Sequence, residues 1–254
     1  SLLIAWGVEN NNVPVSLYEY AIGLSPGEAE TVNWTENGTD TTVSISGLSL
    51  LNGNTYYGSV RAYNTDGNVT QIYSGDGITI DIAKPVIASQ SVANGSTISL
   101  ANSFSIEYVY SELLQSAEIQ VSSMISGTHE YNWEDDRITV SFTGPFASLD
   151  TIQISPNVVD LAGNVSDPAQ HEFYTEILAD YNSDMAIDVI DLMQFIDAWN
   201  NNDLTYELAP VTGTVPNLVP DLDSAFSVRD VATFCRMWYW SNPTAQRVLA
   251  SNST

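Results

Sequence analysis

The chain contains very few cations. Its 254 residues include 31 Asp and Glu against 6 Lys and Arg, so the formal net charge is −25 at pH 7, and Lys84 is the single lysine. Nucleic acids and anionic membrane surfaces are bound by clustered cations, so this composition excludes both kinds of partner by charge. A surface this acidic favours divalent cations and is typical of an extracellular or saline setting.

Cysteine and long apolar runs are also scarce. Cys235 is the only cysteine, which excludes an internal disulfide and a zinc site built from cysteines. No apolar run approaches the roughly 18 residues of a membrane-spanning helix, so we expect no membrane insertion. The residues after Ser1 show neither the basic nor the apolar stretch of a signal peptide, so we expect a mature chain or a portion of a longer protein.

The sequence gives little sign of catalysis. It contains no H-E-x-x-H, P-loop or G-x-G-x-x-G motif. His129 and His171 stand alone in β-like segments, and the acidic run 134–136 is typical of a solvated turn. We therefore predict no catalytic residues, no organic cofactor and no enzyme activity.

Residues 1–83 predict a first β-sandwich. Apolar residues alternate in short runs such as 56–62, and turn signals such as Asn37-Gly38 separate the runs. No helical stretch interrupts this pattern, which indicates antiparallel rather than parallel sheets.

The same segment resembles a known family. The runs SLYEYAIGLSPG, VNWTENGTDTTVSISGLSLLNGNTYYGSVRAYNTDGNVT and SGDGITIDIAKP resemble a fibronectin type III domain of bacterial secreted proteins. The resemblance implies a sandwich of about seven strands with Trp6 and Trp34 in or near the core, and with Tyr56 as the corner tyrosine. SLLIAW resembles the second strand of such a domain. We therefore expect the first strand to be missing, either because the chain is cut there or because another chain supplies it.

Residues 84–177 predict a second β-sandwich. Phe104, Ile106 and Tyr108 alternate on one face, and Ile138 and Val140 repeat the pattern. The runs PVIASQSVANGSTISLANSFSIEYVYSELL, DDRITVSF, DTIQISPNVVDLAGNVSD and HEFYTE resemble the bacterial Ig-like domains of surface-layer and adhesin proteins. This resemblance implies a sandwich without an active site.

Residues 178–254 change from strand to helix periodicity. Two apolar sets lie at the helical spacing i, i+3, i+4, i+7, and they are 39 positions apart. These sets are Leu192, Phe195, Ile196 and Trp199, then Val231, Phe234, Cys235 and Trp238. We predict that the two helices pack together through these faces, which would bury Cys235 as a structural thiol.

An oxygen-rich loop precedes each predicted helix. The first loop places oxygen donors at positions 1, 3, 5, 7, 9 and 12, where position 7 offers its backbone carbonyl: Asp180, Asn182, Asp184, Ala186, Asp188 and Asp191. Calcium binds six to eight such oxygens, so we predict a calcium site here. The second loop retains Asp221, Asp223, Ser227 and Asp230 but has Val219 at position 1. We expect weaker calcium binding in the second loop, or none with the fold retained.

The duplicated loop and helix resemble dockerin domains, which are EF-hand-like calcium modules that dock secreted enzymes or surface proteins onto cohesin modules. The resemblance implies one or two bound Ca²⁺ ions and a cohesin-like partner. The chain departs from the family in the long insertion NNNDLTYELAPVTGTVPNLVP, in the second loop and in the partner-choosing positions Val189-Ile190. A module that packs against its neighbouring domain is therefore an equal alternative.

The predicted fold class is mainly β, with two consecutive antiparallel β-sandwiches followed by a small α-helical calcium module. We predict a non-catalytic, extracellular adhesion, structural or assembly segment of a large secreted or cell-surface bacterial protein, with other protein modules as partners and with filament formation as one role. The alternative is an accessory region of a secreted hydrolase that docks cohesin or binds carbohydrate, for which Trp238, Tyr239 and Trp240 are the aromatic candidates.

Overall fold

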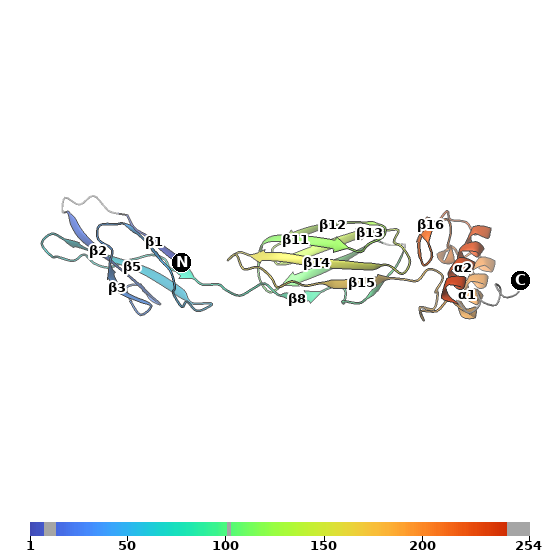
Figure 1. Ribbon diagram of the computed structural model, residues 1–254, viewed down its shortest axis with the longest axis horizontal. Coiled ribbons are helices and arrows are strands. Elements are labelled where there is room, and N and C mark those ends of the chain that lie inside the picture. Colours follow the sequence, from blue (N-terminus) through green and yellow to red (C-terminus); the bar gives the residue numbers. More distant parts are fainter. Residues whose placement is uncertain (8–13, 101–102, 243–254) are drawn as a thin grey trace, which may run out of the picture. The chain divides into compact units, whose positions relative to one another are not determined.

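The computed structural model describes residues 1–7, 14–100 and 103–242. The chain divides into two compact units, Ser1–Ala83 and Lys84–Thr254. Most described elements are strands in antiparallel sheets, and the two α-helices lie near the end of the second unit (Figure 1). The prediction of a mainly β chain is therefore confirmed. Among the described helices, none is long and apolar enough to cross a membrane.

The first unit is built from two sheets. One pairs β1 with β4, and the other has the order β3-β2-β5-β6, with β7 also paired to β5. The strands are β1 (Leu2–Ala5), β2 (Val15–Gly23), β3 (Val32–Glu36), β4 (Thr42–Ile45), β5 (Thr55–Asn64), β6 (Tyr73–Ser74) and β7 (Ile78–Thr79). The buried core between the sheets is small and centres on Leu2, Ile22 and Tyr56.

Two contacts fix how the sheets of the first unit meet. The Leu51 backbone N–H donates to the Tyr56 hydroxyl at 3.0 Å, which confirms Tyr56 as the corner tyrosine. Gly58 lets β1 approach β5 closely, since a Cβ at this position would lie 3.0 Å from the side chain of Ile4. Trp34 is half-buried, and the Arg61 guanidinium lies 4.3 Å from its ring centroid.

The second unit begins with a larger sandwich. Its sheets have the orders β12-β13-β10-β8 and β11-β14-β15-β9, and only the β15–β9 pairing in these sheets is parallel. The strands are β8 (Ile87–Gln90), β9 (Thr97–Ile98), β10 (Phe104–Tyr110), β11 (Leu114–Ser122), β12 (Thr128–Glu134), β13 (Arg137–Thr143), β14 (Thr151–Asp160) and β15 (His171–Thr175). Alternating residues of these strands fill the core, as the sequence predicts: Ile106, Tyr108, Ile138, Val140, Phe142, Ile152 and Ile154 are all buried.

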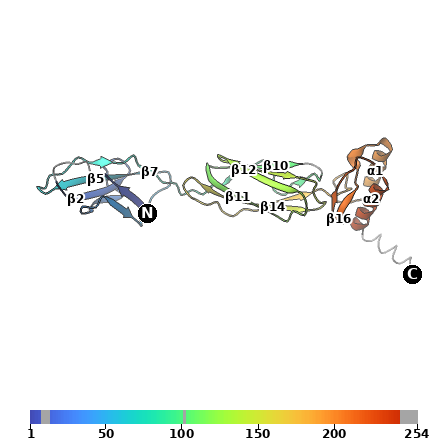
Figure 2. The same cartoon turned by 90° about the horizontal axis from the view of Figure 1, so that it is seen from above.

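The rest of the second unit is helical with one inserted hairpin. Its elements are α1 (Val189–Asn201), the short 3₁₀-helix η1 (Leu204–Tyr206), β16 (Val211–Thr214), β17 (Asn217–Pro220) and α2 (Val228–Ser241). Figure 2 shows α1 and α2 beside one another, with β16 next to them. The rings of Phe195 and Phe234 stack at 5.4 Å between the helices. The long insertion noted in the sequence therefore folds as η1 and the β16–β17 hairpin.

The helical part and the sandwich of this unit share one apolar core. Phe146 from the sandwich and Phe195 and Met237 from the helices belong to the same buried cluster. Backbone contacts join the two parts, because the N–H of Ser148 donates to the Leu218 carbonyl at 2.8 Å. The division of this unit after residue 177, like the other predicted domain bounds, stays a prediction.

The predicted apolar faces of the helices are right only in part: Phe195 and Phe234 are buried, and Leu192 and Trp238 are partly buried against the core. The helices bury Asp191, Phe195 and Ala198 in α1 and Asp230, Thr233, Phe234 and Met237 in α2. Cys235 is exposed rather than buried, and Ile196 is 49% exposed. The buried face of each helix is rotated from the predicted one because its first buried residue is an aspartate, Asp191 or Asp230. A prediction from the spacing of apolar residues cannot include a buried aspartate.

Candidate functional site: the loops before the two helices

The first loop, residues 180–191, is folded by its own side-chain oxygens. The two carboxylate oxygens of Asp180 accept N–H groups from Asp184 at 3.2 Å and from Met185 at 2.9 Å. Asp184 accepts the N–H of Ala186 at 2.9 Å. Because each bond turns the backbone back toward an earlier side chain, the loop is compact rather than extended.

Asn182 adds a further link inside this loop. Its Oδ1 accepts the N–H of Asp184 at 3.1 Å, and its Nδ2 donates to Asp184 Oδ2 at 2.8 Å. Ile187, at position 8, is buried. The Nδ2 of Asn242, just after α2, donates to its carbonyl at 2.8 Å. The loop before α1 is thereby tied to the end of α2.

Asp188 and Asp191 form a capping box at the start of α1. Asp188 accepts the N–H of Ile190 at 2.7 Å, and Asp191 Oδ2 accepts the N–H of Asp188 at 2.9 Å. Asp191 Oδ1 also reaches back to the N–H of Tyr181 at 2.7 Å and that of Asn182 at 3.4 Å. Asp191 is fully buried, so one carboxylate joins the first residues of the loop to the helix that ends it.

The chemistry of these donors suits a hard divalent cation, because the predicted set contains only carboxylate, amide and carbonyl oxygens. Desolvation raises the pKa of Asp180, and the charges of Asp191 and Asp184 raise it further, whereas N–H bonds from Met185 and Asp184 oppose this. A cation would relieve this repulsion. Within the described residues 180–191, no three carboxylates bring their oxygens within 4.8 Å of one another. The donors therefore match a calcium loop in their chemical type and in their spacing along the chain. Their carboxylate oxygens do not converge on one point in this structure.

The second loop repeats this arrangement with one replacement. Ser227 caps α2, and Asp230 Oδ2 accepts the Ser227 N–H at 2.7 Å. Asp230 Oδ1 accepts the N–H groups of Leu208 and Ala209, both at 2.9 Å. Asp230 therefore bonds to residues that precede the β16–β17 hairpin in the chain. Asp191, by contrast, bonds to Tyr181 at the start of its own continuous loop.

Glu207 is the residue that sequence reasoning missed. It directly precedes Leu208, as Asp180 directly precedes Tyr181 in the first loop. Its Oε1 accepts the N–H groups of Asp223 at 2.6 Å and Ala225 at 3.4 Å, and the residue is 6% exposed. Glu207 therefore holds the place that Asp180 holds in the first loop. Val219, which the 39-residue offset assigns to position 1, lies in β17 instead. The sidechains of Asp221 and Asp223 are at the exposed surface of this loop.

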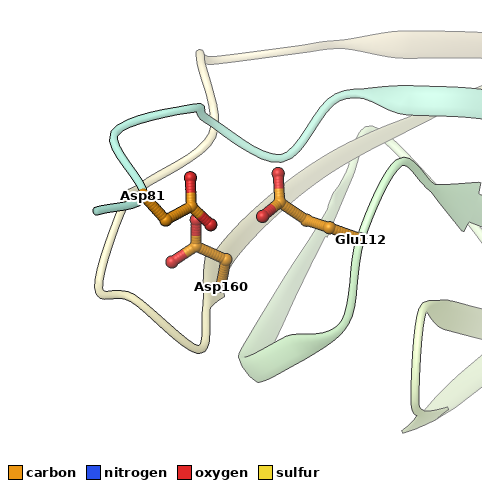
Figure 3. A group of neighbouring side chains, drawn as sticks. All are labelled: Asp81, Glu112 and Asp160. Atoms are coloured by element: carbon orange, nitrogen blue, oxygen red, sulfur yellow. The ribbon is translucent and has the colours of Figure 1, made fainter. Parts of the chain in front are cut away.

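Two other acidic groups of the second unit lie at the opposite end of its strands. The Glu112 and Asp160 carboxylates lie within 4.8 Å of one another (Figure 3). Asp160 is buried and accepts the N–H groups of Ala162 and Asn164, both at 2.8 Å, and the Nδ2 of Asn164 at 2.8 Å. Burial acts to raise the pKa of Asp160, but these hydrogen bonds outweigh it, so the pKa is lowered. This carboxylate holds the turn after β14 together.

The other residues that could take part in catalysis or ligand binding lie in places where they have a structural role. Residues 23–27 have the G-x-S-x-G spacing of hydrolase nucleophile turns, but they join the antiparallel strands β2 and β3 and no helix follows. His171 lies in β15 with its ring 5.1 Å from that of Tyr108, and burial lowers its pKa. Trp238 and Trp240 are partly buried against the core, so the aromatic run at the end of α2 is not a free row of rings.

Comparisons with known proteins give only partial structural matches. No protein-family model matches the chain, and no curated protein matches it in sequence. Among solved structures, the fibronectin(III)-like modules of Clostridium thermocellum CbhA are similar at 14% identity over 66% of this chain and 82% of that chain, with a TM-score of 0.33. The SrpA adhesin of Streptococcus sanguinis is similar at 14% identity over 58% of this chain and 90% of that chain, with a TM-score of 0.34.

A third similar structure, domains FN1–FN3 of chicken CNTN1, shares 13% identity over 68% of this chain and 61% of that chain, with a TM-score of 0.26. All three superpose only in part at these scores. The architecture of this chain therefore follows from its own strand order and register.

Proposed function

We propose that this chain is a non-catalytic adhesion or assembly segment of a secreted or cell-surface bacterial protein, in which calcium orders the module 178–254. The proposal rests on the arrangement of oxygen donors in the first loop, residues 180–191. Its oxygen donors occur at the spacing of a calcium loop, and three of its aspartates already fold the backbone through N–H bonds. A metal bound there would position the start of α1.

Calcium binding would couple directly to folding in this arrangement. In the metal-free loop, burial raises the pKa of Asp180, and the charges of Asp191 and Asp184 add to this. A cation that binds only the folded loop stabilises it by mass action. Because Asn242 bonds to Ile187, we expect the effect to extend to α2.

Exposed apolar residues on and next to α1 support the proposal that this part of the chain binds another protein. Met185 is 80% exposed, Val189 58%, Ile190 48% and Met193 66%. Large apolar side chains gathered on a surface are typical of interaction sites. This surface suits another protein module, either a cohesin-like domain or a neighbour in a filament, and it is close to the loop that calcium would order.

Calcium titration of the metal-stripped chain by calorimetry tests the calcium part of the proposal. We expect saturable heat at one site, and a second, weaker site if the Glu207-containing loop also binds. Asp184→Asn keeps the size of the side chain and removes one ligand charge, so the affinity should fall by about tenfold or more. Asp197→Asn removes the same charge from an exposed position on α1 and should leave the affinity unchanged. Absence of heat at millimolar calcium would contradict the proposal.

A further inference from the structure

The sandwich of the second unit has β12, β8, β11 and β9 as the outer strands of its two sheets, and β12 differs from the other three. Its seven residues pair with β13 in unbroken register from Thr128 to Glu134. β8 and β9 have four and two residues, and β11 shifts register between Leu114 and Ser116. Short or bulged edge strands resist pairing with another chain, whereas a long and regular one favours it.

The outer edge of β12 has no partner among the described residues, where β12 pairs only with β13. The turn between these strands has two residues, so Glu134 and Arg137 close it as a hydrogen-bonded pair. Because such pairs alternate along the strands, the backbone groups of Tyr131 and Trp133 face the outer edge. β12 also contains no lysine and no proline, the residues that commonly block an edge of this kind.

The inner face of β12 carries two aromatic rings that remain partly exposed. Tyr131 lies opposite Val140 in the register, and Trp133 lies opposite Ile138. Opposite residues point to the same face of a sheet, so both rings are on the side that forms the core. The two core residues are fully buried, whereas Tyr131 is 41% and Trp133 39% exposed. The rings can therefore pack against the side chains of an added strand.

The outer face of β12 carries charge of one sign. Glu130 and Glu134 are exposed, and neither is in an ion pair among the described residues. Arg137, which lies opposite Glu134, pairs instead with Glu107 at 2.9 Å and with Asp136 at 3.6 Å. β12 therefore presents two carboxylates whose charge is not balanced by a neighbouring cation.

We propose that β12 binds an extended segment of another protein, which adds an outer strand to this sheet and carries basic residues on one face. The backbone of the segment would pair with Tyr131 and Trp133 at the outer edge. Its basic side chains would lie beside Glu130 and Glu134. Its apolar side chains, on the other face, would cover the two rings. The same carboxylates exclude acidic segments.

A second copy of this chain fits this edge less well. Two paired β12 strands would bring the glutamates of both copies to neighbouring strands of one sheet, where like charges are destabilising. The formal net charge of −25 on each chain also opposes self-association. The occupant is therefore a basic segment of a different protein.

The probe is a labelled peptide of sequence KVTVKVT, whose two lysines have the spacing of Glu130 and Glu134, and its binding to the full chain is followed by fluorescence anisotropy. We expect saturable binding that weakens with added salt and that is lost when glutamate replaces both lysines. Glu130→Lys should lower the affinity about fivefold or more. Glu118→Lys is its matched control, because it makes the same charge change at an exposed position of β11, and it should leave the affinity nearly unchanged.

Two substitutions at Tyr131 separate the backbone from the ring. Tyr131→Val and Tyr131→Pro both remove the ring, but proline also removes the N–H at the outer edge. Tyr131→Pro should therefore bind the peptide about tenfold more weakly than Tyr131→Val. Changes in the peptide test the same pairing without altering the protein. N-methylation of the valines, which would pair with the edge, should abolish binding, and N-methylation of the lysines and threonines should preserve it.

The proposal is overturned by no saturable binding at millimolar peptide, by equal effects of the two methylation patterns, or by equal affinity of the two Tyr131 variants. If Tyr131→Pro fails to fold, as judged by circular dichroism, the methylated peptides decide. Sedimentation of the chain alone should show a monomer. A dimer that Glu130→Lys or Tyr131→Pro abolishes would identify a second copy as the occupant and overturn the assignment.

Discussion

Replacing Asp191 by alanine should destabilise the second unit strongly even without calcium. The fully buried carboxylate of Asp191 accepts N–H groups at 2.7 Å from Tyr181, at 2.9 Å from Asp188 and at 3.4 Å from Asn182. Each buried donor left unpaired costs about 1–3 kcal/mol. The two short bonds dominate, so we expect a loss of about 3–5 kcal/mol in the free energy of unfolding.

The assay is urea unfolding of the metal-stripped chain followed by near-ultraviolet circular dichroism. In a thermal melt of a unit this size, the same loss lowers Tm by about 6–20 °C, at about 2–4 °C for each kcal/mol. The control is Asp197→Ala, an exposed aspartate on the same helix, which should change stability by less than about 0.5 kcal/mol. Equal, small effects of the two substitutions would refute the role assigned to Asp191.

Three further predictions concern other parts of the chain. Tyr56→Phe removes the acceptor of the Leu51 N–H and should cost the first unit about 1–2 kcal/mol in urea unfolding; no change would contradict the corner role. The lowered pKa of Asp160 contributes stability above about pH 4, and this stability is lost as the pH falls through the folded-state pKa. Asp160→Asn should therefore weaken the dependence of the free energy of unfolding on pH in the acid range. Cys235 is exposed, so a thiol reagent should modify it in the folded chain; protection until unfolding would contradict this.

Much of the fold follows from local patterns in the sequence. Alternating runs predict the sandwich strands because one face of each strand must be buried, as at Ile138 and Val140. The link from Tyr56 to Leu51 is also predictable, because the corner depends on a short stretch of chain.

The parts that could not be predicted depend on contacts between distant residues. The faces of α1 and α2 are rotated because Asp191 and Asp230 are buried by their hydrogen bonds rather than by apolar character. Glu207 was missed because the β16–β17 hairpin separates it from the loop that it completes. Because the number of residues in the hairpin is not fixed by the loop, the spacing of residues in the sequence cannot show that the two halves belong together.

Amide hydrogen exchange with and without calcium tests the central claim most directly, because it reports each segment separately. We predict that calcium slows exchange in the loop 180–191 and in α1 and α2, while the core strands of both sandwiches exchange equally in the two conditions. Unchanged exchange throughout residues 178–242 at millimolar calcium would contradict a calcium-ordered module. The capping boxes of Asp191 and Asp230 would then be sufficient to fold it.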